Sequence, residues 1–177
     1  MEEMARDEHF VPDGKTYPDL VATFHYWQRL RGDRLAPAWS DINLLDIPHA
    51  AIPRVCVVDV IPAPLDFIYR FWGTSITRMH HYDLTGKSVR DLTPASYART
   101  IHRQYETVVS NRQPEGFLTE IPLDSGTFAY YAVFRMPLSS DGIHVDMVLS
   151  AEDYGENREQ MRQALEKSAA ARTGERN

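Results

Sequence analysis

Five short runs rich in β-branched and aromatic residues constrain the fold most, because they form two blocks around one long helical pattern. Turn-forming prolines, glycines and aspartates separate neighbouring runs within each block, which favours antiparallel hairpins. The runs span residues 55–61, 67–72, 116–122, 127–137 and 143–150. Strands grouped in this way predict an α+β domain with an antiparallel sheet of five strands.

The long helical pattern lies between the two blocks, over residues 93–111. Thr93 is suited to cap the helix and Pro94 to occupy its first position. Apolar residues recur on one side at the spacing of a buried helical face. This stripe comprises Tyr97, Ile101, Tyr105, Val108 and Val109.

A second helix is predicted near the start of the chain, over residues 16–31. Thr16 is a candidate cap, Pro18 fits the first turn, and Gly32 is a plausible end. The apolar stripe comprises Leu20, Phe24, Trp27 and Leu30. A proline-rich connector follows, in which we expect Trp39 to anchor the chain to the core.

The pattern divides the chain into a flexible leader (1–15), one domain (16–152) and a polar C-terminal tail (153–177). Within the tail, Met161, Ala164, Leu165 and Ser168 have the spacing of a weakly amphipathic helix.

Charge and composition exclude several classes of protein. The formal net charge is −6, which argues against a nucleic-acid-binding surface. The acidic start lacks the pattern of a secretion signal, and no apolar run is long enough to span a bilayer. We therefore expect a cytoplasmic, soluble protein. The single cysteine, Cys56, excludes an internal disulfide and a cysteine-based zinc site.

Several stretches resemble a known family. The segments "LRGDRLAPAWSDINLLDIP", "FIYRFWGTSI", "DLTGKSVRDL" and "YETVVSNRQP" are similar to a PAS-like family of mostly alphaproteobacterial proteins, once classed as a domain of unknown function. The resemblance implies a five-stranded antiparallel sheet with helices on one face, a small-molecule cavity between them, and an extra N-terminal helix. It implies no catalytic residues and leaves the cofactor unknown. The family usually has a glycine just before the Asp-Leu-Thr-Gly-Lys turn, where this chain has His81-Tyr82.

Aromatic side chains are the candidates for lining such a cavity. Tyr69 and Phe71 alternate on one predicted strand and Tyr130 and Phe134 on another, so each pair should share a face. Tyr105 would face them from the long helix. Arg70 and Arg135 fall on the opposite strand faces, where they can pair with carboxylates or reach an acidic ligand.

His102 on the long helix has two interpretations. In some PAS domains a histidine on the corresponding helix binds haem iron. The alternative is a half-buried histidine with an ordinary hydrogen bond. Of these candidates, Tyr69, Phe71, His102, Tyr105, Tyr130 and Phe134 form the predicted ligand-binding set.

Other conspicuous residues have structural interpretations. Thr85-Gly86-Lys87 lacks the spacing of a phosphate-binding loop and predicts a tight turn. His80 and His81 point in different directions on a helix, so they suit solvent exposure or helix capping better than metal binding. Cys56 lies in a strand-like run, without the helical motif of flavin-adduct PAS domains, and is expected to be a buried structural thiol.

The preferred functional hypothesis is a non-catalytic sensory or regulatory module that binds a small molecule, a signalling partner, or both. Its apolar N-terminal helix must cover the sheet or a second copy, and we expect a homodimer through it. No output domain is visible, so a protein partner is expected, whereas nucleic acid and membranes are not. The alternatives are a small proton-transfer enzyme and a ligand-free interaction module.

Overall fold

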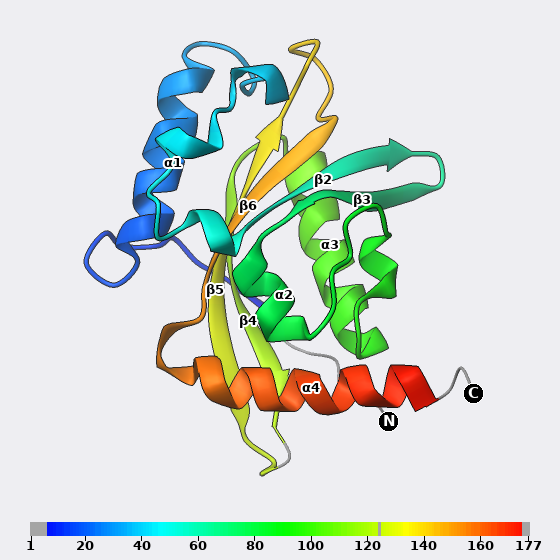
Figure 1. Cartoon of the computed structure of the whole chain (residues 1–177). Helices are drawn as coiled ribbons and strands as arrows, with labels where there is room; N and C mark the ends of the chain where they lie inside the picture. The colour runs from blue at the N-terminus through cyan, green and yellow to red at the C-terminus, as the bar shows by residue number, and fades with distance from the viewer. Residues whose placement is uncertain (1–6, 124, 175–177) are drawn as a thin grey trace.

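The computed structural model describes residues 7–123 and 125–174, which form one sheet with helices on both of its faces (Figure 1). The strands are β1 (Asp7–His9), β2 (Val55–Pro62), β3 (Leu65–Trp72), β4 (Glu115–Pro122), β5 (Phe128–Leu138) and β6 (Met147–Asp153). The α-helices are α1 (Pro18–Arg31), α2 (Thr74–His80), α3 (Ala95–Asn111) and α4 (Arg158–Gly174). Short 3₁₀ turns include η1 (Trp39–Asp41), η3 (Ile52–Arg54) and η4 (Val89–Asp91).

All neighbouring strands are antiparallel, in the order β1-β4-β5-β6-β2-β3. The predicted α+β class and antiparallel sheet are therefore confirmed. The two strand blocks meet where β6 pairs with β2, so the last predicted strand lies beside the first. The long helix α3, which connects the blocks, crosses one face of the sheet (Figure 1).

The sheet has a sixth strand that the sequence did not predict. β1 lies in the segment expected to be a flexible leader, and it pairs with β4 at the sheet edge. Gly116 makes this pairing possible, because a Cβ atom there would lie 2.2 Å from the carbonyl oxygen of Phe10. His9 also forms an ion pair with the buried carboxylate of Glu115.

The last strand begins later than predicted, at Met147 rather than Ile143. Side-chain hydrogen bonds hold the residues that precede β6 in a loop, so they do not pair with a neighbouring strand. The carboxylate of Asp141 accepts from the backbone N–H groups of Ile143 and His144, and that of Asp146 accepts from Ser140. Such local bonds compete with strand pairing.

The helix starts also differ from the predicted ones. Helix α1 begins at Pro18, and Thr16 precedes it in a turn where Asp13 accepts hydrogen bonds from the N–H groups of Lys15 and Thr16. Helix α3 begins at Ala95, with Pro94 in the capping position in place of Thr93.

Apolar side chains form one large cluster on each face of the sheet, and Tyr26, Ile47 and Ala51 form a small third one. The inner core lies under α2, α3 and α4 and includes Cys56, Val58, Phe67, Tyr69, Trp72, Ile76, Met79, Tyr97, Ile101, Tyr105, Tyr131, Val133, Tyr154, Met161 and Leu165. The outer core lies under α1 and includes Leu20, Trp27, Val55, Val57, Ala132, Phe134, Met136, Leu138, Leu149 and Ala151. Trp39 packs against the outer core, as predicted. The predicted arrangement is confirmed: α2, α3 and α4 cover one face of the sheet, and the extra N-terminal helix α1 packs on the other.

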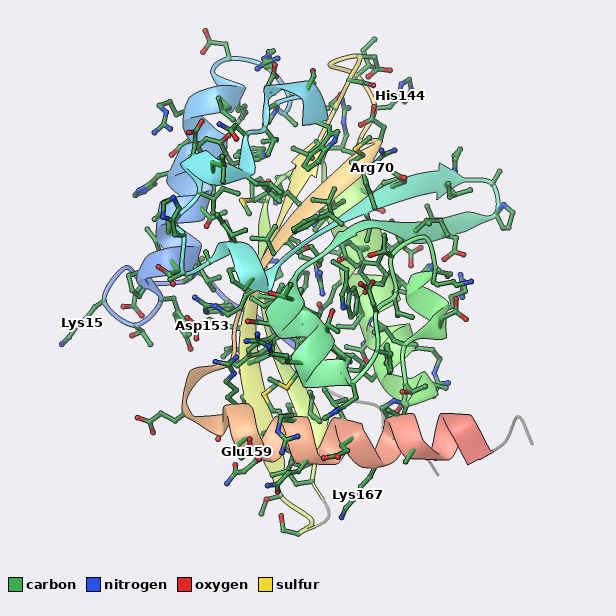
Figure 2. The ribbon with its side chains drawn as sticks, in the orientation of Figure 1. Lys15, Arg70, His144, Asp153, Glu159 and Lys167 are labelled. Atoms are coloured by element: carbon green, nitrogen blue, oxygen red, sulfur yellow. The ribbon has the colours of Figure 1, made fainter. Side chains whose placement is uncertain are left out.

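The C-terminal segment contains a complete helix. Helix α4 extends over 17 residues, and its Met161 and Leu165 are buried in the inner core beside α2. Glu159 and Lys167 lie on its exposed side (Figure 2). None of the helices among residues 7–123 and 125–174 is long and apolar enough to cross a bilayer.

Candidate ligand-binding site

Arg135 is the centre of a polar network inside the inner core. Its side chain points from β5 toward α3, and the residue is only 1% exposed. The Nε and Nη2 groups donate to Gln104 Oε1 at 3.0 and 2.8 Å, and Nη1 donates to Ser150 Oγ at 2.9 Å. The guanidinium also lies 4.1 Å from the ring centre of Tyr105, which is a cation–π contact.

This environment corrects the predicted role of Arg135. We expected a carboxylate or a ligand acid group, but the direct partners are a neutral amide, a hydroxyl and an aromatic ring. Arg70 does pair with a carboxylate, that of Asp59, at 2.7 Å. Because arginine remains protonated in proteins, the inner core holds a fixed positive charge.

Hydroxyl and thiol groups extend the network. Gln104 Nε2 donates to Thr119 Oγ1 at 2.8 Å, and Ser150 Oγ donates to the Tyr105 hydroxyl at 3.3 Å. Cys56 Sγ lies 3.5 Å from that hydroxyl, and burial raises the pKa of the thiol to about 12. Cys56 is therefore a buried, protonated thiol, as the sequence predicted.

Tyr97 and Tyr131 form a second polar pair, with their hydroxyl oxygens 2.7 Å apart. A buried acid lies close to them: Tyr154 donates to Glu152 Oε2 at 2.6 Å. Burial raises the pKa of the Glu152 carboxyl, although the Tyr154 hydrogen bond and Arg135 act in the opposite direction.

Two buried nitrogen atoms near this pair have no hydrogen-bond partner within the described residues. They are Trp72 Nε1, at the end of β3, and His80 Nδ1, at the end of α2. The two rings are adjacent, with centroids 5.5 Å apart, and the rings of Tyr69, Tyr82 and Tyr97 surround them. An unmatched buried donor costs about 1–3 kcal/mol, so these two nitrogen atoms lack the partners that buried polar groups usually have.

The position of His80 corrects the expectation of a solvated or capping histidine. His80 is 2% exposed, and burial lowers its pKa to about 3, so the ring is neutral at neutral pH. His81 has a left-handed backbone that ends α2, and it is exposed. Groups of three or more metal-binding side chains are absent from the described part of the chain.

The six predicted ligand-binding residues do not lie together. Tyr69 and Tyr105 lie in the inner core. Phe71 and Phe134 pack in the outer core, on the opposite face of the sheet. Tyr130 lies on the same side of β5 as Phe134 and is 44% exposed. The prediction that Tyr69 and Phe71 share a face is wrong, because a bulge in the pairing of β3 with β2 reverses the alternation at Arg70.

His102 lies at the edge of the inner core, with its ring against Phe67. Its Nε2 atom lies 2.9 Å from Arg90 Nη2, which also donates to the Leu65 carbonyl oxygen. The same nitrogen lies 3.2 Å from the Leu65 carbonyl oxygen, so it already has polar neighbours within the protein. Since that nitrogen already has a partner, the structure fits the hydrogen-bonded interpretation of His102 better than a haem ligand.

Sequence reasoning named Arg135 with other partners, and it gave no ligand-binding role to the rest of these polar residues, namely Trp72, His80, Tyr97, Gln104, Tyr131 and Ser150. One signal was present: on β5 the apolar residues Ala132, Phe134 and Met136 alternate with Tyr131, Val133 and Arg135. Both sets are buried. The alternation therefore assigned the two sets to opposite faces of the sheet, but it did not show which face packs against α3.

Comparison with known proteins agrees with this fold. The family model described as "PAS domain" matches residues 16–151. The chain belongs to the PAS domain family. No functionally curated protein is recognisably similar to it in sequence.

Solved structures of related fold include light-oxygen-voltage and PAS domains. An RNA-binding light-oxygen-voltage receptor is 17% identical, with a TM-score of 0.46 over 80% of this chain and 42% of its own length. The LOV protein of Rhodobacter sphaeroides is 12% identical, with a TM-score of 0.43 over 70% of this chain and 89% of that one. A PAS domain from Colwellia psychrerythraea is 13% identical, with a TM-score of 0.42 over 59% and 88%. This chain therefore spans less than half the length of the RNA-binding light-oxygen-voltage receptor.

Proposed function

We propose that this PAS domain is a non-catalytic sensory or regulatory module that binds a small molecule in its inner core. One observation carries the proposal: among the described residues, Trp72 Nε1 and His80 Nδ1 are buried without hydrogen-bond partners, and aromatic rings surround them. An indole N–H can only donate, so the guest must offer at least one acceptor atom. The surrounding rings favour an apolar or aromatic body on the same molecule.

The tyrosines and His80 of the inner core argue against the proton-transfer alternative. Burial raises the pKa values of Tyr69, Tyr97 and Tyr105 well above the ordinary value, and it lowers that of His80 to about 3. A general acid or base works best when its pKa lies near the operating pH. These groups are each held in one protonation state at neutral pH, which suits binding better than proton transfer.

Native mass spectrometry of freshly purified protein, with an absorbance spectrum, tests the proposal. We expect a copurified mass in the wild type and in Trp39→Phe, a matched tryptophan change outside the inner core. We expect that mass to be reduced or lost in Trp72→Phe, which removes the unpaired N–H group. A folded wild type without any added mass would contradict the proposal and support a ligand-free interaction module, with water satisfying the two nitrogens.

We also propose a cytoplasmic protein that signals through a protein partner and forms a homodimer through α1. Leu20 and Trp27 already pack on the sheet, so the dimer must use the opposite side of the helix, where Ala22, His25 and Arg29 are exposed. Light scattering should show a dimer, and Ala22→Glu should shift it toward monomer. A clean monomer at high concentration would contradict this arrangement.

A further inference from the structure

An apolar groove opens on the surface at the rim of the inner core. None of its lining residues belongs to α2. We call it the rim groove. It lies between the β2–β3 hairpin, the end of α3 and the loop that precedes β6, and its volume is about 580 Å³. The lining residues are Val60, Pro62, Leu65, Val109, Arg112, Ile143, His144, Val145 and Asp146.

The floor of the rim groove is continuous with the inner core. Val145 is buried in that core, and Val60, Leu65 and Val109 pack against it while remaining partly exposed. Ile143 is 61% exposed at the edge, which is unusual for an isoleucine. The groove therefore offers apolar contacts without any need to open the sheet.

Arg112 supplies the positive charge of the groove. It follows α3 in a left-handed conformation, and its Nη2 donates to the Ile143 carbonyl oxygen at 2.7 Å. This bond fixes the side chain over the groove and leaves most of its N–H groups available. No ion pair joins Arg112 to a carboxylate within the described residues, although the carboxylate of Asp146 also lines the groove.

The acidic groups near Arg112 are engaged elsewhere. Asp146 Oδ2 accepts from the backbone N–H and the hydroxyl of Ser140. Asp141 Oδ2 lies 2.7 Å from His144 Nδ1, on the loop marked by His144 in Figure 2. Among the described residues that line the groove, Arg112 is thus a cation without a carboxylate partner, although Asp146 also brings a negative charge to the lining.

From this geometry we propose that the rim groove binds a small amphipathic carboxylate, such as a medium-chain fatty acid. Its carboxylate would accept charge-assisted hydrogen bonds from Arg112, and its apolar chain would cover Val109, Leu65 and Val145. The site is separate from the Trp72–His80 pair, so it does not depend on the function proposed above.

Chemical-shift mapping with octanoate, 1-octanol and acetate tests the proposal on the full chain. Octanoate should bind saturably, with its largest shifts at Val109, Arg112 and Ile143. Arg112→Gln should weaken octanoate about three- to tenfold, the range for a partly exposed charged contact, and leave octanol unchanged. Ile143→Ser should weaken both ligands about two- to threefold, because it removes apolar contact area.

Arg158→Gln at the start of α4 is the matched control, since it removes an exposed positive charge that does not line the rim groove and should leave binding unchanged. Acetate should bind far more weakly than octanoate, because it lacks the apolar chain. Equal octanoate binding in wild type and Arg112→Gln, shifts that map to another surface, or no saturable binding would each overturn the proposal. These outcomes are independent of any copurified mass in the inner core.

Discussion

At the scale of single residues, His80 makes stability depend on pH. Burial lowers its pKa from 6.5 to about 3, so the unfolded chain takes up a proton at a pH where the folded chain does not. Stability is therefore lost as the pH falls from about 6.5 toward 3, by up to about 1.4 kcal/mol per pH unit.

Replacing this histidine should remove that loss. When the pH falls from 6.5 to 4.5, the free energy of unfolding should decrease in both proteins. We expect the decrease to be about 2–3 kcal/mol smaller in His80→Phe than in the wild type. Urea unfolding at several pH values measures the difference. An unchanged slope in His80→Phe would show that the ring is not held neutral.

Arg135 and Gln104 should behave as a coupled pair. Gln104→Leu leaves the buried guanidinium without the oxygen that accepts two of its N–H groups, so we expect a loss of about 3 kcal/mol. Adding Arg135→Met removes the unmatched charge, and the double variant should be more stable than Gln104→Leu alone. Denaturation of both single variants and the double variant measures the coupling, and simple additivity would refute it.

At the scale of elements, β1 is held by an unusually close approach to β4. Gly116→Ala would place a methyl group against the Phe10 carbonyl oxygen, so we expect β1 to separate while the other strands stay paired. Hydrogen exchange should show at least about tenfold faster exchange at the Phe10 amide, which donates to Gly116.

Gly14→Ala is the matched glycine change for this experiment. An added Cβ there would meet only Val21, at an ordinary contact distance of 3.8 Å. The Phe10 amide should keep its protection in that variant. Retained protection in Gly116→Ala as well would mean that the backbone relaxes around the methyl group without losing the strand.

At the scale of the whole molecule, Cys56 reports on global unfolding. Its thiol is buried in the inner core, and its pKa is raised to about 12, so the reactive thiolate is scarce in the folded state. We expect a thiol reagent to modify the single cysteine at the unfolding rate in native buffer, and rapidly in denaturant. Fast modification without denaturant would indicate local opening of β2.

The sequence was sufficient to predict the order of the longer strands and helices. It was insufficient to predict the edge strand β1 or the residues of the site. Long periodic segments such as α3 carry a strong local signal, and hairpins carry turn residues. A three-residue edge strand has neither, so β1 was missed. The bulge at Arg70 and the inward side of Arg135 depend on contacts between distant strands and helices, which local spacing does not encode.

The covering of both sheet faces restricts how this PAS domain can communicate. Helices α2, α3 and α4 cover one side, whereas α1 covers only part of the other, where Phe128 and Tyr130 of β5 remain exposed (Figure 1). The proposed signalling partner would therefore have to contact the outward sides of the helices, the loops, the sheet edges, or the exposed part of β5. A mutational screen for the downstream receiver is best directed at those places, beginning with the solvent-facing side of α4.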